Sequence, residues 1–574
     1  MKTINARISV LSSVVAVFFI VIIGRLFWLQ VMNNDLFEAR ADRQQSITGT
    51  LKGKRGDIVV HEKQRIYPVA TTKDDWLFTI NPKLVDNVED LYQKFTSVGL
   101  VLDKEEFLLK AGKINDPYEV MQHHVPNSIK KKIEELAIKS VAFELEPGRF
   151  YPAGDFASQT IGFVGADGTG QYGLERFYNK ELSGEDGSFS GDASAGTRLL
   201  LFGKNLIDQN SDGASVHLTI DAGVESFLVS SLKDTLEKYD ARSAGGIIIN
   251  PKTGKILAFA SIPSYDPNIY SKEKDPAVFQ NPLVESLFEM GSVIKPLTIA
   301  AALDAGSIQP ADTYVDTGKR TIDGRTIENY DGVARGRVAI QEILSQSLNM
   351  GAVYVMEQLG KDKMRQYFNN YGFAEKTNID LPNEATGNLK NLESSRLIEY
   401  ATASFGQGIS MTPLALARAL SSLGNGGFLV TPYIVEEVKY ANGLTQEKKV
   451  SEPKRILKEE TSKTITRMLV QVVDTKLANG HGKIPGYSVA AKTGTAQIAS
   501  SDRRGYSGEF IHTFFGYGPA YDPQFLVVLY LEKPQGIRYA SESLTEPFRA
   551  IMKHLFSYFE VLPDRPQELS DKQP

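Results

Sequence analysis

Residues 246–260, GIIINPKTGKILAFA, decide the fold of the second half of the chain. Two β-rich runs flank the Pro-Lys-Thr-Gly segment at 251–254, so this stretch predicts a β-hairpin. FFGYGPAYDPQFLVVLYLE (514–532) predicts a second hairpin, and YSVAAKTGTAQ (487–497) predicts a strand just before it. Helices are expected from residue 221 and at about 541–559. This order predicts an α+β fold, with one antiparallel sheet, flanking helices and a separate helical lobe; the crevice between sheet and lobe is the expected site.

Composition narrows the class of protein. The chain has 574 residues, a net charge of -5, 42% hydrophobic and 23% charged residues, so at least two globular domains are expected. There is no long basic run, which argues against nucleic acid as a partner. Cysteine is absent and the seven histidines are scattered, so we expect no disulfide, no thiolate chemistry, no metal site and no cofactor.

The N-terminus predicts a membrane anchor. Residues 8–31 are mostly apolar and long enough to cross about 30 Å of hydrocarbon as one helix. Lys2 and Arg7 precede this run, which places residues 1–7 in the cytoplasm and the rest of the chain outside. A cleaved signal peptide is the alternative, because Ala39-Arg40-Ala41 resembles a cleavage site, but that site lies well beyond the apolar run.

Changes in composition predict the domain limits. Residues 32–205 are expected to form a non-catalytic pedestal domain, and a Gly, Asp and Ser-rich segment near 205–214 marks its end. Residues 206–562 are expected to form the second domain. The tail 563–574 is expected to be disordered.

One Ser-x-x-Lys pair stands out from the others. Five such pairs occur, and four of them are expected to be surface or capping residues: Ser128/Lys131, Ser230/Lys233, Ser271/Lys274 and Ser451/Lys454. The fifth, Ser292/Lys295, follows Gly291 and precedes Pro296, a residue favoured in the first turn of a helix. Ser292 is therefore expected at the positive end of a helix dipole. Lys295 leads into an apolar helix, where desolvation lowers its pKa and fits it to act as a base for the serine.

Two further motifs carry polar groups at element ends. Ser347-Leu348-Asn349 is the only Ser-x-Asn of the chain and opens a predicted helix. Lys492-Thr493-Gly494-Thr495 lies on a predicted strand, where the glycine indicates close approach of a backbone or ligand. Its lysine and hydroxyls are suited to hold a carboxylate. The earlier copy, Lys252-Thr253-Gly254, is expected to be only the turn of the first hairpin.

The order of these three motifs resembles that of the penicillin-binding proteins and serine β-lactamases. Within that superfamily the chain is similar to the class B penicillin-binding proteins, which are monofunctional peptidoglycan D,D-transpeptidases. The similarity includes FGQGISMTPLALARAL from Phe405 and, for the pedestal, RGDI from Arg55, RFYP from Arg149 and GLERFYN from Gly173. It implies a penicillin-binding transpeptidase domain on an elongated pedestal, with one transmembrane helix in the bacterial cytoplasmic membrane.

The resemblance also implies roles for matching residues. Ser292 is the nucleophile, Lys295 its general base, Ser347 a proton shuttle, and Asn349 a ligand of the substrate amide. Lys492 supplies positive potential, and Thr493, Gly494 and Thr495 bind substrate, the two hydroxyls at its terminal carboxylate. The backbone N–H groups of Ser292 and Thr495 form the oxyanion hole. The substrates implied are stem peptides ending in D-Ala-D-Ala, and β-lactams acylate the same serine.

Partners and alternatives follow from the same resemblance. It implies a separate polytopic membrane glycosyltransferase and other membrane proteins of the divisome or elongasome. Ser-x-Asn with Lys-Thr-Gly favours the septal branch over elongation. A membrane-bound D,D-carboxypeptidase and a non-enzymatic β-lactam sensor remain alternatives.

Three departures from the family pattern are visible. Met290 stands where proline is usual, and Leu348 where division-type members commonly have serine. After RGDI at Arg55 the usual continuation is missing, which puts the local contacts of the pedestal in doubt.

Overall fold

The computed structural model describes residues 2–28, 46–51, 53–185, 187–192, 205–206, 211–500 and 505–570. The chain divides into two units, each described separately below. The first unit comprises residues 1–54 and 183–213, and the second comprises 55–182 and 214–574.

The first unit contains one helix and a small sheet. Helix α1 is Lys2–Phe27. Strands β1 (Ser46–Leu51), β6 (Gly187–Asp192) and β7 (Asn205–Leu206) pair in that order, both pairs antiparallel. Among the helices of the described residues, none combines the length and the apolar character needed to cross a membrane. Residues 29–31 of the predicted anchor lie outside the described part of the chain.

A five-stranded antiparallel sheet forms the centre of the second unit and confirms the fold predicted for it. The strands are β9 (Ser243–Ile249), β10 (Ile256–Ile262), β19 (Ala490–Ala499), β20 (Tyr506–Gly518) and β21 (Phe525–Glu532). Their order is β10-β9-β21-β20-β19, so the first hairpin pairs with the last strand of the domain through β21 and β9. As predicted, Lys252-Thr253-Gly254 is the turn of the first hairpin, with Gly254 at φ 81°. Strand β19, which carries the second Lys-Thr-Gly, is left at the sheet edge.

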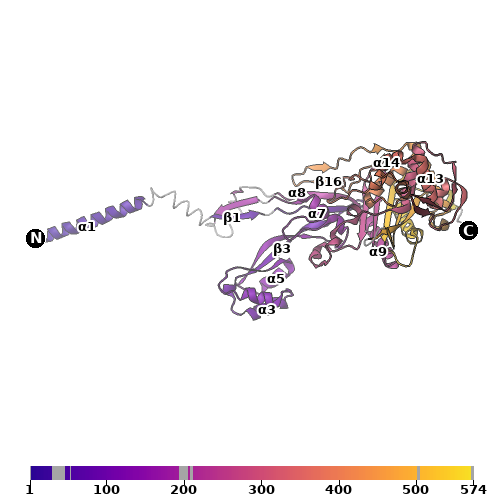
Figure 1. Cartoon of the computed structure of the whole chain (residues 1–574). Coiled ribbons are helices and arrows are strands. Elements are labelled where there is room, and N and C mark those ends of the chain that lie inside the picture. The colour runs from indigo at the N-terminus through magenta and orange to yellow at the C-terminus, as the bar shows by residue number, and fades with distance from the viewer. Residues whose placement is uncertain are drawn as a thin grey trace. The chain divides into compact units, whose positions relative to one another are not determined.

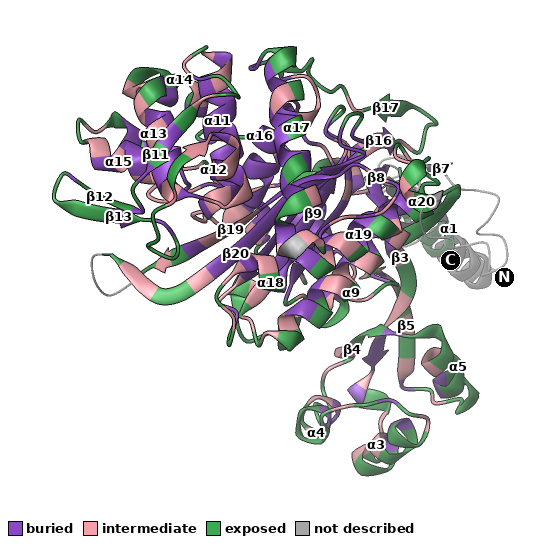
Figure 2. Cartoon of the chain, turned by 90° about the vertical axis from the view of Figure 1, so that its right-hand side faces the viewer, coloured by how far each residue is buried: buried purple, intermediate pink, exposed green. Residues whose placement is uncertain are grey.

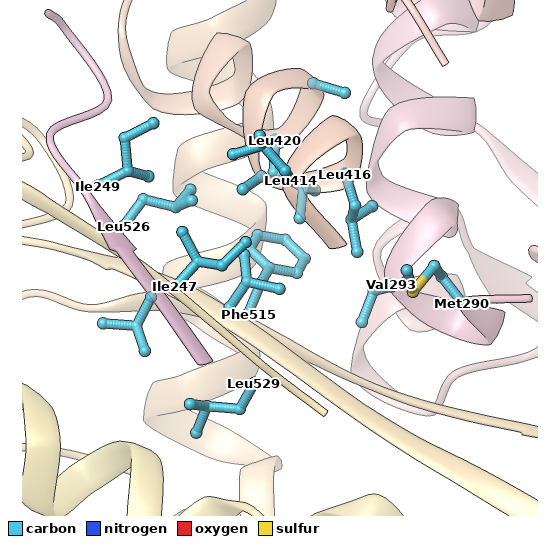
Figure 3. Packing of buried hydrophobic residues seen from close by; sticks show 14 of the residues in the cluster. Ile247, Ile249, Met290, Val293, Leu414, Leu416, Leu420, Phe515, Leu526 and Leu529 are labelled. Atoms are coloured by element: carbon cyan, nitrogen blue, oxygen red, sulfur yellow. The ribbon is translucent and has the colours of Figure 1, made fainter. Parts of the chain in front are cut away.

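Helices cover both faces of this sheet (Figure 2). On one face lie α9 (Ala222–Lys238) and α19 (Thr545–Tyr558); on the other lie α11 (Lys295–Asp304), α16 (Pro413–Gly424) and α17 (Glu459–Thr475). Figure 3 shows Leu414 and Leu420 of α16 near Phe515 of the sheet, while Leu416 lies toward Val293. The predicted helix at 541–559 is two helices, because α18 (Ala540–Ser543) and α19 are separated at Leu544.

The helical lobe contains the segment with the Ser-x-Asn motif. Its helices are α12 (Gln341–Ser345), α13 (Asn349–Leu359), α14 (Lys361–Asn370) and α15 (Leu397–Ala403). Two small hairpin-like pairs accompany them: β11 (Thr313–Asp316) with β14 (Gly336–Ala339), and β12 (Lys319–Ile322) with β13 (Arg325–Glu328). Leu348 is fully buried between α12 and α13.

A second sheet of this unit carries the pedestal segments (Figure 1). It is formed by β2 (Ile58–Glu62), β3 (Arg65–Ile80), β4 (Glu119–Val125), β5 (Val141–Phe150), β8 (Ser215–Asp221), β16 (Val435–Lys439) and β17 (Thr445–Glu447). Helices α3 (Val88–Ser97), α4 (Lys104–Ala111) and α5 (Asn127–Glu135) pack with β3 and β4 around a separate apolar core. The three pedestal motifs meet at Glu175, because its fully buried carboxylate pairs with Arg55 at 2.7 Å and with Arg149 at 2.6 Å.

The disordered tail expected at 563–574 is a wrong prediction for residues 563–570. The Ser488 N–H donates to the Asp564 carboxylate at 2.7 Å, Arg565 forms an ion pair with Asp474 at 3.0 Å, and α20 spans Gln567–Ser570. The hydrogen bond and the ion pair join residues far apart in sequence, so composition alone could not reveal them. Residues 571–574 lie outside the described part.

Candidate active site

Ser292 lies in a tight turn that leads into a buried helix. Residues Gly291–Ile294 form a 3₁₀ turn, and α11 follows at once with Pro296 in its first turn, as the sequence predicts. Gly291 has φ 64°, and its N–H donates to the Gly406 carbonyl at 3.1 Å. A Cβ on Gly406 would lie 2.2 Å from the Gly291 carbonyl oxygen, so the GQG segment must have glycine there to hold the serine turn.

Lys295 is completely buried one turn after Ser292. Its Nζ donates to the Ser347 carbonyl at 2.5 Å and to Ser347 Oγ at 3.2 Å. Within residues 211–500, no hydrogen bond joins it to Ser292, and its side-chain contacts are to Ser347 instead. Burial, and secondly the positive charge of Lys492, holds the pKa of Lys295 well below its ordinary value.

Ser347 joins the two lysines. It lies between α12 and α13 at φ 54°, a left-handed conformation that residues other than glycine rarely adopt. Its Oγ also accepts from Lys492 Nζ at 3.1 Å. One hydroxyl therefore receives hydrogen bonds from both buried amines. Asn349 begins α13, and its side-chain amide donates to the Glu328 carbonyl at 2.9 Å.

Strand β19 presents its motif residues on alternate faces. Lys492 points toward Ser347, and burial lowers its pKa to about 7. Gly494 has the same orientation, and a Cβ there would lie 2.7 Å from the Met290 carbonyl oxygen, which confirms the predicted close approach of another backbone. Thr495 faces the opposite way and accepts at Oγ1 from the Ala540 N–H at 3.1 Å.

These residues surround one open cavity of about 1290 Å³. Six of the eight predicted site residues line it: Ser292, Ser347, Asn349, Lys492, Thr493 and Thr495. Lys295 and Gly494 lie behind its wall, in contact with Ser347 and the serine turn respectively. In the described ranges, no three His, Cys, Asp or Glu side chains are grouped so that they could hold a metal ion.

The cavity rim contains residues that the sequence did not single out. Tyr506 donates to Glu289 at 2.9 Å, and burial raises the pKa of Glu289. Tyr330 meets Tyr539 edge to face, with ring centroids 5.7 Å apart. Only Glu289 could have been suspected from the sequence, because it is three residues before Ser292.

Two family models match the chain. The one described as "Penicillin binding protein transpeptidase domain" matches residues 244–553, and the "Penicillin-binding Protein dimerisation domain" matches residues 50–218. The chain belongs to the class B penicillin-binding proteins. The stage V sporulation protein D of Bacillus subtilis is 33% identical over 90% of this chain and 80% of its own length. The peptidoglycan D,D-transpeptidase FtsI of Buchnera aphidicola (Baizongia pistaciae) is 27% identical over 98% of this chain and 97% of its own.

Solved structures share the fold of this penicillin-binding protein. Penicillin binding protein 2X of Streptococcus thermophilus superposes with a TM-score of 0.74 at 21% identity, covering 92% of this chain and 82% of that one. A peptidoglycan synthetase of Bifidobacterium adolescentis gives 0.69 at 24% identity, over 91% and 98%.

Proposed function

We propose that Ser292 is the nucleophile of this serine-type peptidoglycan D,D-transpeptidase. Its Oγ attacks the carbonyl carbon between the two D-alanines of a stem peptide, and the serine proton passes to neutral Lys295. The peptide C–N bond then breaks, and the departing D-alanine takes a proton through Ser347. The product is an ester between Ser292 and the shortened peptide. One observation supports this proposal above all: two buried lysines, Lys295 and Lys492, both form hydrogen bonds to Ser347 Oγ. Ser347 lines the same cavity as Ser292.

The other motif residues bind and polarise the substrate in this proposal. Lys492 holds positive potential over the site, and the Thr493 and Thr495 hydroxyls donate to the terminal carboxylate. Gly494 binds substrate through its backbone, and Asn349 holds the peptide amide. The N–H groups of Ser292 and Thr495 form the oxyanion hole. This pairing is supported by the close approach of the two segments, since a Cβ on Gly291 would lie 3.0 Å from the Thr495 carbonyl oxygen.

A second stem peptide completes the proposed reaction. Its amine attacks the ester, releases Ser292 and forms the cross-link. A β-lactam opened by Ser292 also leaves an ester on this serine, but its acyl group is that of the drug and is not passed efficiently to an acceptor. A role in division rather than elongation is supported by the relatives named FtsI. The relative from Bacillus subtilis is named as a sporulation protein, so relatives of this chain also include a protein of that process.

The placement in the cell is part of the proposal. This cell-envelope protein is anchored by residues 8–31, with residues 1–7 in the cytoplasm and the catalytic domain outside the cytoplasmic membrane. The pedestal covers 32–205 and the transpeptidase domain 206–562. Its proposed partners are a polytopic glycosyltransferase, which would supply the glycan strands, and other membrane proteins of the divisome.

Covalent labelling of the full chain tests the nucleophile. A labelled penicillin is expected to modify the wild-type chain and not Ser292→Ala. Ser230→Ala is the matched control, because Ser230 is exposed on α9 and also precedes a lysine by three residues. Persistent label in Ser292→Ala would refute the assignment.

A separate assay identifies the acceptor of the acyl group, which is the amine of a second stem peptide in a transpeptidase and water in a carboxypeptidase. With lipid-linked strands and a partner polymerase, dimeric peptides are expected. Release of D-alanine with free tetrapeptides alone would indicate the carboxypeptidase alternative instead.

A further inference from the structure

A short segment after β21 is tied by three contacts to the Lys-Thr-Gly strand β19 and to its neighbour β20. The Ala540 N–H donates to Thr495 Oγ1 at 3.1 Å. His512 of β20, the cross-strand partner of Thr495, contacts the Arg538 carbonyl at 3.1 Å through Nε2 and Ser543 Oγ at 2.8 Å through Nδ1. All three contacts link the two strands to residues 538–543, and Arg538, Tyr539 and Ala540 line the cavity.

The partners of His512 define its tautomer. A carbonyl oxygen can only accept, so Nε2 carries the proton and donates to Arg538. Nδ1 then accepts from the Ser543 hydroxyl. The side chain is fully buried, and desolvation lowers the pKa of His512 to about 4, so the ring stays neutral at physiological pH with both nitrogens used.

The Ala540 contact orients the Thr495 hydroxyl. A threonine hydroxyl has one hydrogen and two acceptor lone pairs. Because the Ala540 N–H occupies one lone pair, the hydroxyl hydrogen must point away from Ala540. Thr495 faces the cavity, so an anionic group bound there can receive that hydrogen.

We propose that His512 is a positioning residue for recognition of the substrate's carboxylate. By holding residues 538–543 in place, it keeps the Ala540 N–H against Thr495 and makes Thr495 a donor to the terminal carboxylate of the peptide or β-lactam. The inference rests on the proposed function, in which Thr495 binds that carboxylate. His512 does not touch the substrate and acts only through the segment it holds.

The test compares a penicillin with the methyl ester of the same penicillin on the full chain. The second-order rate constant of acylation is measured for each, and the acid-to-ester ratio reports carboxylate recognition. In His512→Leu this ratio is expected to fall about tenfold, the effect of one lost hydrogen bond to a charged group, with the ester rate nearly unchanged. His512→Gln, whose amide can both donate and accept, is expected to restore most of the ratio.

Control variants separate positioning from general damage. His554→Leu removes a histidine of α19 that stacks on Phe227 at 4.0 Å and does not line the cavity, and it should leave the ratio unchanged. Ser543→Ala removes the hydroxyl at Nδ1 and should lower the ratio about threefold, which keeps the inference testable should His512→Leu fail to fold.

Two results would overturn the inference. One is an unchanged acid-to-ester ratio in a folded His512→Leu chain, or in Ser543→Ala if His512→Leu does not fold. The other is an equal loss of both rates, which indicates a purely structural role. Either outcome leaves the assignment of Ser292 intact, because that assignment fails only if the label persists in Ser292→Ala.

Discussion

Gly494→Ala is expected to displace Ser292, the proposed nucleophile, without replacing any side chain of the proposed site. An added Cβ would lie 2.3 Å from Thr513 Oγ1, 2.7 Å from the Met290 carbonyl oxygen and 3.1 Å from Val293 Cγ1. Thr513 cannot simply rotate away at no cost, because its Oγ1 donates to the same Met290 carbonyl at 2.8 Å. Met290 precedes the turn that carries Ser292 and Val293 lies within it, so the turn itself must move.

The size of the movement follows from these distances. Ordinary contact with a Cβ begins near 3.4 Å, so the Met290 carbonyl must withdraw by about 0.7 Å. Such overpacking costs about 1–3 kcal/mol of stability. A misplacement approaching 1 Å at a reacting group slows reaction by about 100-fold. We therefore expect Gly494→Ala to reduce the second-order rate constant of penicillin acylation by about 100-fold, with a smaller loss in the free energy of unfolding.

Gly508→Ala is the matched control. Gly508 lies on the neighbouring strand β20, and a Cβ there meets nothing within 4 Å. This variant should acylate at the wild-type rate and unfold at the wild-type denaturant concentration. The reasoning is refuted if Gly494→Ala acylates within twofold of wild type, or if Gly508→Ala is impaired as much.

Three other perturbations test polar groups of the second unit, two of them ionisable. Burial lowers the pKa of Lys492 from 10.5 to about 7, so between these pH values the unfolded chain binds a proton that the folded chain has lost. The stability of the wild-type chain therefore rises with pH in this range. Between pH 7 and pH 10, its free energy of unfolding in urea should increase by about 1–3 kcal/mol relative to that of Lys492→Met. Burial raises the pKa of Glu225 from 4.5 to about 7, so the stability of the wild-type chain falls as the pH rises through this range. Glu225→Gln should therefore be about 1–3 kcal/mol more stable than wild type at pH 8 but not at pH 4.5. Ser347→Ala removes the hydroxyl shared by both lysines and should slow acylation about 10²- to 10⁴-fold in stopped-flow measurements, while circular dichroism stays unchanged.

Local patterns predicted the central sheet well, because its elements are defined by short-range features. The hairpin at 246–260 has a turn sequence between two β-rich runs, and Pro296 indicates where α11 starts. The break at Leu544 was not predicted, because the helical spacing of apolar residues continues through it. The ordered tail depends on Asp564 reaching Ser488, a contact across 76 residues that no local pattern contains.

For the candidate site too, the sequence predicted the residues better than their contacts. Motif order and the family resemblance named six residues that line the cavity, but they did not predict how those residues contact one another. The left-handed backbone conformation of Ser347 directs both its carbonyl and its hydroxyl toward Lys295. The sequence Ser-Leu-Asn does not predict this conformation. The role proposed for His512 could not be suspected either, since a single buried histidine on a strand is commonly structural and its partners, Arg538 and Ser543, lie 26 and 31 residues further along the chain.

The arrangement of two lysines around one hydroxyl explains how an amine can act as a base at neutral pH. Two ammonium groups bound to Ser347 Oγ in a buried site would repel each other strongly, so one of them must lose its proton. Lys295 is the more affected, because burial and the charge of Lys492 both lower its pKa. A neutral Lys295 can still donate one N–H to the Ser347 carbonyl, which leaves its lone pair able to accept a proton. In the proposed mechanism, the positive charge that Lys492 carries near and below pH 7 therefore helps to make Lys295 a base, and the Ser-x-x-Lys spacing alone gives no sign of this second lysine.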